Sequence, residues 1–521
     1  MIYFEVIIFI TSIFLFTNCS TKRKDNSLRN SLFLYFLGNQ TNNTPSGYSN
    51  FSNSYLGYNL NTLLWEGGIS DTNALKSLSD LKPNIIRYPG GTESDYFDWE
   101  TGGTVNTCRF IQTSGGGCRT WDRLTLTERP FRTQTTYKDG KLEQFKILLN
   151  QSNSEALFVL NLITADYDTN LKMLEKAESL GIEVKYVEIG NEHYYAETNY
   201  ETVFTNSNSY GLLAKSWISK LRTRFPKAKF AITGIVPEIN LNNKTYYFST
   251  DQEYITRATN WNSGLASSGA MNEADSVSLH VYARPNGNLT STSFSATTVE
   301  SVLNHADDYI DLYFTRPEFL AITKNKPLWF TEFNINAGEA NGLVRSWTHG
   351  LYNILFLTRM LESEQVNMLI CHMLMGNDTW QSIFHPGTFA GAVLVSGATP
   401  YNRTASGEAL HLFNLAYNKS QYIRRLKLSD IGLSGQDERR VKAFKFRNSS
   451  STDDSKLFLV NATASSIKLN LQTELSSNWT KITTYNSLPA TNVLNSSSLT
   501  KATNVFSKEP IIPSYSIVLV E

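Results

Sequence analysis

Short apolar runs alternate with longer amphipathic stretches along most of the chain. The apolar runs lie at residues 55–60, 84–88, 156–162, 184–189, 230–234, 276–282, 327–334 and 366–375. Stretches with helical spacing lie at 71–82, 142–149, 171–180, 209–225, 299–314, 343–361 and 408–415. Strands that alternate with helices are typical of folds built on a parallel sheet. The pattern therefore predicts an α/β fold, a (β/α)8 TIM barrel over residues 54–418.

Local signals mark the ends of several of these helices. Asp71 is an N-cap residue type at the start of the first helix, and Pro83 ends that helix. Gly181 follows residues 171–180 as a C-terminal glycine, and Pro226 stops the helix at 209–225. These signals support the predicted order of elements.

The pattern changes at about residue 419. Short apolar runs at 441–446, 457–460, 467–471, 482–485 and 516–520 are separated by turns rich in Asn, Ser and Gly. No helical spacing appears among them. Residues 419–521 are therefore predicted to form a C-terminal β-sandwich domain.

The first 53 residues differ from the rest of the chain. Residues 2–16 form an apolar block that is too short for a membrane span and suits a signal peptide, which we place at residues 1–18. The segment that ends in Cys19 resembles a bacterial lipoprotein box, which implies a lipidated Cys19 and a membrane anchor. Residues 19–53 are rich in Asn, Ser and Thr and are predicted to be a polar tether. We expect an exported protein, either a cell-surface or outer-membrane lipoprotein or a secreted one.

Composition narrows the choice of partners. Lys+Arg and Asp+Glu both number 47, so no basic surface points to nucleic acid. Aromatic residues make up 12% of the chain, which serves core packing and also suits clefts that stack sugar rings.

The cysteines are few. Cys108 and Cys118 flank a Gly-rich segment, and in an exported protein they are predicted to form a disulfide. Cys371 lies in an apolar run and is predicted to be a buried thiol. No metal-ligand spacing occurs, so neither a metal nor another cofactor is predicted.

Two glutamates follow predicted strands in the same way. Glu192 comes after the fourth strand, preceded by Gly190 and Asn191, and Glu332 lies at the end of the seventh, between Thr331 and Phe333. Catalytic groups of barrel enzymes lie at these strand ends. One carboxylate that attacks and one carboxylic acid that donates a proton are the minimal apparatus for retaining hydrolysis of a glycosidic bond.

These two motifs resemble those of the clan-A retaining glycosidases, which carry their glutamates on the fourth and seventh barrel strands. The resemblance implies that Glu192 is the acid/base, that Glu332 is the nucleophile in a double displacement, and that Asn191 contacts the sugar 2-hydroxyl.

The same resemblance suggests further substrate-binding residues. Arg87 matches an arginine that keeps the nucleophile charged, and His280 with Tyr282 matches a pair around the nucleophile. Trp380 is expected to form a stacking floor, although packing roles stay open for it, His280 and Tyr282. Glu66 is either a substrate contact or a solvated loop charge.

The segment from Arg87 to Gly91, with residues 96–99, resembles the α-L-arabinofuranosidase family. The heparanase and β-glucuronidase family is similar overall. The chain departs from the arabinofuranosidase pattern at residues 193–195 and in the cysteine loop. The resemblance implies an oligo- or polysaccharide substrate.

A β-glucuronidase or a β-xylosidase is the alternative enzyme, and a non-catalytic glycan-binding surface lipoprotein is the alternative of another class. The presence of both glutamates and of Arg87 argues against that binder.

Overall fold

The computed structural model describes most of residues 47–521. The stretches it does not describe are 52–54, 61–66, 105–106, 113–117, 121–134, 137, 196–197, 236–238, 241–244, 247–251, 284–295, 315–325, 336–341, 377–381, 388–393, 419, 449–454 and 475–477. The predicted signal peptide and Cys19 therefore lie outside the described residues, as do Glu66 and Trp380. Of the helices that are described, none combines the length and the apolar character needed to cross a membrane.

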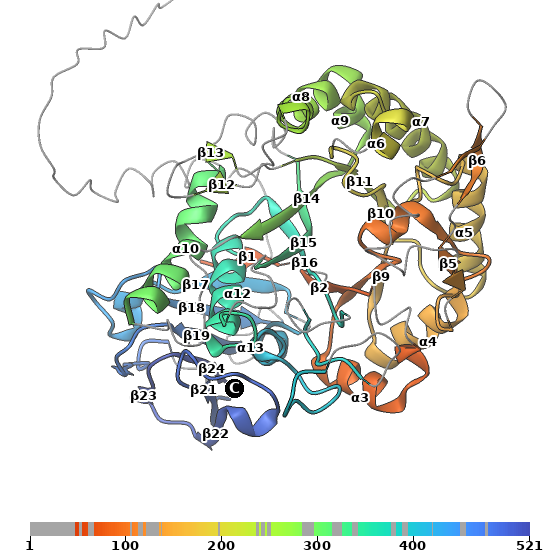
Figure 1. Ribbon diagram of the computed structural model, residues 1–521. Coiled ribbons are helices and arrows are strands. Elements are labelled where there is room, and N and C mark those ends of the chain that lie inside the picture. Colours follow the sequence, from red (N-terminus) through yellow and green to blue (C-terminus); the bar gives the residue numbers. More distant parts are fainter. Residues whose placement is uncertain are drawn as a thin grey trace, which may run out of the picture. The chain divides into compact units, whose positions relative to one another are not determined.

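Eight parallel strands close into a barrel (Figure 1), as the sequence predicts. In chain order they are β2 (Leu56–Asn59), β3 (Ile85–Tyr88), β9 (Glu155–Val159), β10 (Tyr186–Ile189), β11 (Lys229–Thr233), β14 (Ser276–Ala283), β15 (Leu328–Ile335) and β16 (Val366–Cys371). Each strand pairs with its successor, and β16 pairs with β2. The two predicted catalytic glutamates therefore do follow, or lie on, the fourth and seventh strands, β10 and β15.

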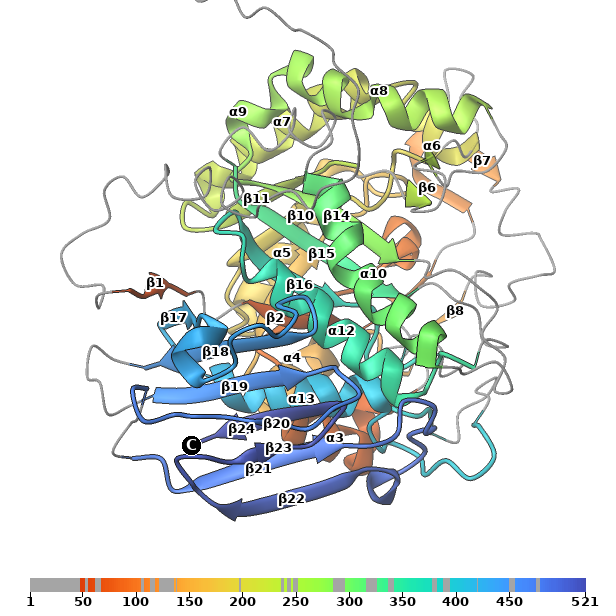
Figure 2. The same ribbon diagram turned by 90° about the vertical axis from the view of Figure 1, so that its left-hand side faces the viewer.

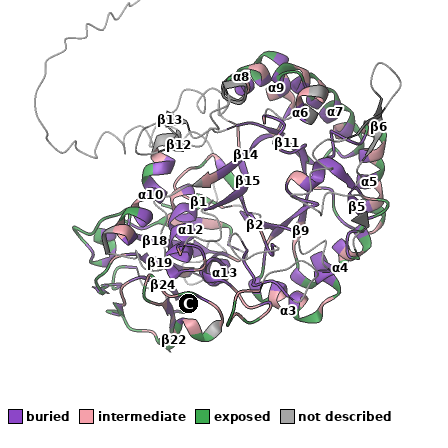
Figure 3. Cartoon of the chain, in the orientation of Figure 1, coloured by how far each residue is buried: buried purple, intermediate pink, exposed green. Residues whose placement is uncertain are grey.

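Helices surround the barrel, with buried faces inward and exposed faces outward (Figure 3). They are α3 (Thr72–Leu81), α4 (Leu142–Ser152), α5 (Tyr167–Ser179), α6 (Thr198–Val203), α7 (Ser207–Arg224), α8 (Gln252–Ser268), α9 (Ala270–Glu273), α10 (Ala296–Phe314), α12 (Trp347–Met360) and α13 (Ala405–Tyr417). The side chain of Asp71 accepts from the backbone of Asn73 and Ala74, which confirms the predicted N-cap of α3.

The long segment between β3 and α4 contains short elements of its own. They are the 3-10 helix η3 (Thr92–Tyr96), the three-stranded sheet of β4 (Phe97–Asp98), β5 (Gly103–Thr104) and β8 (Thr135–Thr136), and the hairpin of β6 (Thr107–Gln112) and β7 (Cys118–Thr120). The side chains of Cys108 and Cys118 lie outside the described part, so their predicted disulfide stays a prediction. A second hairpin, β12 (Ile239–Asn240) with β13 (Thr245–Tyr246), follows β11.

The C-terminal region forms a large antiparallel sheet with a small one against it (Figure 2), which confirms the predicted sandwich. The large sheet has the order β1 (Ser49–Asn50), β17 (Tyr422–Arg425), β18 (Val441–Arg447), β19 (Ser455–Asn461), β24 (Ser516–Val520), β21 (Lys481–Asn486) and β22 (Thr500–Val505). The small sheet pairs β20 (Ile467–Lys468) with β23 (Ile511–Ile512). Strand β1 comes from the segment predicted as a tether.

The central strands of the large sheet are buried on both faces. In β18, Val441 and Ala443 belong to a cluster that includes Ile467 and Ile512 of the small sheet. Phe444 and the residue two further on, Phe446, point the other way and join the core of the barrel. Since successive strand residues alternate between faces, one strand serves both layers, which explains why every residue of β18 is buried.

The barrel interior changes character along its axis. The part nearer the amino ends of the strands is filled by an apolar cluster of Ile85, Leu157, Ala231, Trp329, Met368 and Ile370. The buried side chains that follow, towards the carboxyl ends of the strands, are polar, and Asn59, Arg87 and Glu188 are all 0% exposed. Buried charges must be paired or hydrogen-bonded. The polar layer therefore marks the candidate site.

Candidate active site

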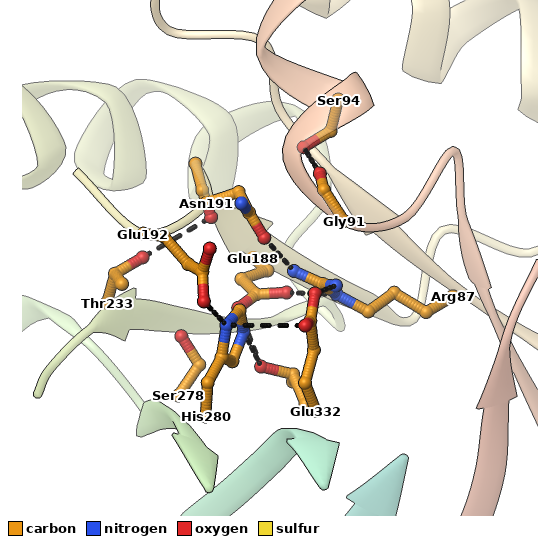
Figure 4. Close-up of polar contacts among 12 residues, drawn as sticks. Arg87, Gly91, Ser94, Glu188, Asn191, Glu192, Thr233, Ser278, His280 and Glu332 are labelled. Carbon is orange, nitrogen blue, oxygen red and sulfur yellow. Dashed lines mark hydrogen bonds and ion pairs between the residues drawn. The ribbon is translucent and has the colours of Figure 1, made fainter. Parts of the chain in front are cut away.

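Arg87, near the end of β3, connects four strands of the barrel (Figure 4). Its Nε donates to Oε2 of Glu188 at 2.7 Å, and its Nη1 donates to Oε1 of Glu332 at 2.7 Å. The same Nη1 donates to Oδ1 of Asn59 at 3.0 Å, and Nη2 donates to Oδ1 of Asn191 at 2.8 Å. A guanidinium with this planar set of donors fixes the relative positions of all four acceptors.

Glu332 is held as a carboxylate. Tyr282 donates its hydroxyl proton to Oε2 at 2.5 Å, and the rings of His280 and His372 lie 3.8 and 3.6 Å from the same oxygen. Burial by itself raises the pKa of Glu332, but the charges of His280 and Arg87 and the hydrogen bond from Tyr282 outweigh it and hold the pKa well below its usual range. Glu332 is therefore ionised at neutral pH, as a nucleophile must be.

Besides Glu332, Glu188 is a buried carboxylate of this site, and it is not among the predicted site residues. It lies within β10, one residue before Ile189, and accepts from Arg87 and from the hydroxyl of Thr331 at 2.8 Å. Burial raises its pKa, yet the charge of Arg87 and the contact with His280 lower it to about 2. A glutamate inside an otherwise apolar strand was the signal for it, because such a charge requires a buried partner.

His280 links two of the carboxylates. The hydroxyl of Thr331 gives its only proton to Glu188, so its oxygen accepts from Nε2 of His280 at 3.1 Å. Nδ1 of His280 lies 2.8 Å from Oε1 of Glu192. Both ring nitrogens thus face acceptors, which requires an imidazolium. Burial opposes that charge, but Glu332, Glu188 and Glu192 raise the pKa of His280 to about 10.

Glu192 occupies an unusual backbone conformation at the end of the fourth strand. Its φ is 50°, in the left-handed region, and Gly190 two residues earlier has φ 84°. A Cβ on Gly190 would lie 2.1 Å from Cε1 of His193, so only glycine fits there. The side chain of Glu192 is 13% exposed, and its Oε1 accepts from the hydroxyl of Tyr194 at 3.2 Å. Glu192 thus meets solvent, while Glu332 is more deeply buried.

The two glutamates lie close together. One carboxylate oxygen of Glu192, one of Glu332 and a ring nitrogen of His280 all lie within 4.8 Å of one another. Retaining glycosidases separate their carboxyl groups by about 5–5.5 Å and inverting ones by about 6.5–9.5 Å. The same three groups could ligate a metal ion, but Nδ1 of His280 acts as a donor here and Arg87 already neutralises Glu332. The arrangement therefore favours proton transfer and nucleophilic attack.

Asn191 offers a donor to a substrate. Its Oδ1 accepts from Arg87, and the residue is completely buried. Its Nδ2 has no hydrogen-bond partner within the described part of the chain. An unpaired buried amide costs about 1–3 kcal/mol, which a substrate hydroxyl would relieve.

The structure brings six of the predicted residues together, and these are Arg87, Asn191, Glu192, His280, Tyr282 and Glu332. Sequence reasoning missed Asn59, Glu188, Tyr194 and His372. Asn59 ends β2, and its Nδ2 donates to the carbonyl of Thr331 at 3.3 Å and lies 3.1 Å from Nδ1 of His372. Asn59 is the last residue of its strand and His372 directly follows β16, and these positions were the available signal. Cys371 is a buried free thiol, as predicted.

Comparisons with known proteins identify solved structures of the same fold. No protein-family model matches the chain, and no curated protein matches it by sequence. A family 51 α-L-arabinofuranosidase from Bifidobacterium longum is similar in structure, with a TM-score of 0.62, 13% identity, and coverage of 92% of this chain and 98% of that one. The α-L-arabinofuranosidase from Thermotoga petrophila has a TM-score of 0.58 and 15% identity, over 92% of this chain and 98% of that one.

A third structure, the 4-O-α-L-rhamnosyl-β-D-glucuronidase from Fusarium oxysporum, has a TM-score of 0.56 and 13% identity, over 92% of this chain and 99% of that one. All three matches extend over nearly the whole length of both chains. They show that this chain has the barrel-and-sandwich fold of these structures.

Proposed function

We propose that the chain is a retaining glycoside hydrolase, with Glu332 as nucleophile and Glu192 as acid/base. The observation that carries the proposal is the pair of glutamates, Glu192 just after the fourth barrel strand and Glu332 on the seventh, with oxygens within 4.8 Å of one another. Two further features support it. Glu332 is held ionised by Arg87 and Tyr282, while Glu192 keeps contact with solvent.

The first step forms a glycosyl-enzyme. Oε of Glu332 attacks the anomeric carbon as the bond to the leaving oxygen breaks, and the carboxyl proton of Glu192 passes to that oxygen. Asn191 donates its free Nδ2–H to the hydroxyl at carbon 2 of the sugar, an interaction that strengthens in such transition states. Tyr282 and Arg87 hold the attacking carboxylate in place.

The second step returns the enzyme to its starting state. Glu192, now a carboxylate, takes a proton from a water molecule whose oxygen attacks the anomeric carbon. The ester bond to Glu332 breaks, and the sugar leaves with the anomeric configuration of the substrate. His280 donates to Glu192 in this state and stabilises its negative charge.

We propose an α-L-arabinofuranoside as the substrate. The segment from Arg87 to Gly91 supports this choice, and so does the likeness to solved α-L-arabinofuranosidases. A β-glucuronide is the second candidate because one similar structure is a rhamnosyl-glucuronidase. A uronate needs a cation of its own. Within the described region, the cations at the two glutamates are Arg87 and His280, which are buried and engaged with protein acceptors.

Export remains part of the proposal. The apolar block at residues 2–16 and the lipoprotein-like segment before Cys19 support a surface-anchored enzyme that acts on extracellular glycans. Metabolic labelling with a radioactive fatty acid tests this idea. We expect label in the full chain and none in Cys19→Ser. Equal labelling of both would rule out lipidation at Cys19.

Hydrolysis of a panel of aryl glycosides tests the activity. The panel holds the α-L-arabinofuranoside, β-D-glucuronide, β-D-xyloside and β-D-glucoside, and Glu332→Ala is the control. We expect turnover of the arabinofuranoside and none by the variant. Turnover that persists in Glu332→Ala would exclude Glu332 as nucleophile. A chain that turns over none of these and binds glycans on an array would be the non-catalytic binder.

The role of Glu192 has a separate signature. Glu192→Gln removes the proton donor, so we expect a loss of about 100-fold or more on a methyl glycoside, whose leaving group needs protonation. A dinitrophenyl glycoside leaves without a proton, and glycosylation with it should change little. Equal losses on the two substrates would contradict the assignment of the acid.

A further inference from the structure

A second buried polar cluster lies beside the segment that carries Glu192. It consists of Asp95 on η3, His193 directly after Glu192, and Tyr200 on α6. One oxygen of Asp95 lies 3.0 Å from Nε2 of His193, and the other accepts from the hydroxyl of Tyr200 at 2.9 Å. All three residues are at most 1% exposed. None of them takes part in the mechanism above.

The hydrogen bonds fix the orientation of the His193 ring. A carboxylate only accepts, so Nε2 of His193 carries the proton that points to Asp95. Asp95 is anchored in turn, because its backbone carbonyl accepts from the hydroxyl of Thr164 at 3.0 Å. Nδ1 of His193 has no hydrogen-bond partner within the described residues, which fits a neutral ring protonated at Nε2 alone.

His193 is also fixed at its backbone and at the face of its ring. Arg257 of α8 donates from Nη2 to the His193 carbonyl at 2.8 Å. The ring lies over Gly190, where a Cβ would approach Cε1 to 2.1 Å, and it contacts Phe204 with ring centroids 5.1 Å apart. The residue after Glu192 is thus held on every side.

Glu192 needs such support. A non-glycine residue in the left-handed region stores about 1–3 kcal/mol of strain and persists only where its surroundings hold it. The chain is tied down just before it, where Tyr210 donates to the carbonyl of Ile189 at 2.6 Å. Just after Glu192, the chain is held by the contacts of His193. Between these two anchors, the backbone of Glu192 determines where its carboxyl group lies.

We propose that Asp95, His193 and Tyr200 are positioning residues for the acid/base carboxyl of Glu192. The inference rests on the proposed function and adds to it. Asp95 lies eight residues after Arg87 in the chain, so the segment that follows the nucleophile's arginine also orients the acid. His193 belongs to residues 193–195, where the sequence departs from the arabinofuranosidase pattern.

A misplaced acid has a kinetic consequence that a merely loosened fold does not. Displacement of a catalytic group by about 1 Å costs up to about 100-fold in rate, and here the loss would fall on proton donation alone. His193→Leu, which cannot donate to Asp95, should lose about 10- to 100-fold on the methyl glycoside and little on the dinitrophenyl glycoside. His193→Gln keeps an N–H donor of similar reach and should recover most of that loss.

The experiment measures kcat/KM on both substrates for the wild type, Glu192→Gln, His193→Leu, His193→Gln, Asp95→Asn and Tyr200→Phe. His411→Gln is the matched control, because His411 is a buried histidine on α13 whose Nδ1 also has no partner in the described region. We expect it to leave the ratio of the two rates unchanged. If His193→Leu does not fold, Asp95→Asn and Tyr200→Phe carry the test with the same expected direction.

Two outcomes separate the inference from its premise. A wild type that hydrolyses neither substrate would overturn the proposed function. A wild type and a Glu192→Gln variant that behave as expected, together with cluster variants that lose activity equally on both substrates or on neither, would overturn the positioning role alone.

Discussion

At the scale of single residues, the site balances its charges. Arg87 and His280 carry two positive charges, and Glu188 and Glu332 carry two negative ones, all within direct contact. The sum is zero before Glu192 is counted. A protonated Glu192 leaves that sum at zero, and an ionised Glu192 accepts a hydrogen bond from the imidazolium beside it. Glu188 has no place in the chemical steps, yet it keeps both cations in position.

Tyr282→Phe tests how the nucleophile is held. The change removes one hydrogen bond to a charged oxygen, worth about 1.5–3 kcal/mol. It should raise the pKa of Glu332, so that the acid limb of kcat/KM moves to higher pH, and activity should fall about tenfold or more. An unchanged acid limb would mean that Tyr282 does not support the ionised form. Tyr309→Phe is the control, because the Tyr309 hydroxyl donates to the backbone carbonyl of Tyr282, at 3.4 Å.

The protonated His280 predicts a dependence of stability on pH. Its pKa is raised from 6.5 to about 10, so its contribution to folding is fully present below pH 6.5 and is lost as the pH rises through 10. Over that interval, the free energy of unfolding should fall by up to about 1.4 kcal/mol per pH unit from this group. Thermal unfolding of the wild type and His280→Gln between pH 6 and 10.5 measures it. Parallel curves would contradict an imidazolium in the folded protein.

Most of these residues could be chosen from the sequence, because each lies at or next to the end of a recognisable strand. The residues that support them were harder to choose. Glu188 was overlooked, although a glutamate inside an apolar strand was a signal, and Asp95 and His193 are 98 residues apart. Their contact depends on how η3 and the end of β10 approach in space, which periodicity does not encode.

At the scale of elements, residues that mark the ends of helices decided which helices were predictable from the sequence. Helix α3 has an aspartate cap, and α5 ends before Gly181, so both were found. Helix α8 was missed because its residues, rich in Asn, Ser and Thr with a glycine near the end, have weak helical propensity. Tertiary packing explains why α8 contains these weak helix formers. A Cβ on Gly264 would lie 1.8 Å from Oγ of Ser207, so α8 needs a glycine to pass close to α7.

Asp71 and Asp166 both cap helices, but Asp71 makes more hydrogen bonds. Asp71 accepts from the backbone of Asn73 and Ala74 and from the hydroxyl of Tyr401 at 2.6 Å, whereas Asp166 accepts from the backbone of Thr169. Asp166→Ala should lower the free energy of unfolding by about 1 kcal/mol. Asp71→Ala should cost about 1–2 kcal/mol more, because it also removes the hydrogen bond from the Tyr401 hydroxyl to a charged oxygen. Equal costs in urea titrations would show that the Tyr401 contact contributes no stability.

At the scale of the whole described chain, the barrel and the C-terminal sheet form one core. Phe444, Phe458 and Leu519 of the sheet belong to the same apolar cluster as the barrel helices. Trp347 of α12 donates to the carbonyl of Tyr515 at 2.7 Å. The fold class was predictable because strand and helix periodicity persist over many elements. The contribution of β1 was not, since two residues in a polar segment give no signal.

A buried charge joins these two parts. Lys442 of β18 is 1% exposed in its side chain and donates to Asp307 at 3.0 Å and to Glu362 at 3.1 Å. Lys442→Met should lower the free energy of unfolding by about 3 kcal/mol, because it leaves two carboxylates short of a cation. Arg439→Met is the control, since the pair of Arg439 with Asp437 is exposed and worth less than about 1 kcal/mol. Similar small costs for both would contradict a structural role for the buried lysine.

The identity of the nucleophile is the central claim, and trapping the glycosyl-enzyme tests it most directly. A 2-deoxy-2-fluoro glycoside of the accepted sugar with a dinitrophenolate leaving group forms the intermediate quickly and releases it slowly. Mass spectrometry of the digested protein should then find one added sugar, on the peptide that contains Glu332. A sugar attached to another residue, or a wild type that hydrolyses the parent glycoside with inversion and forms no adduct, would contradict the account.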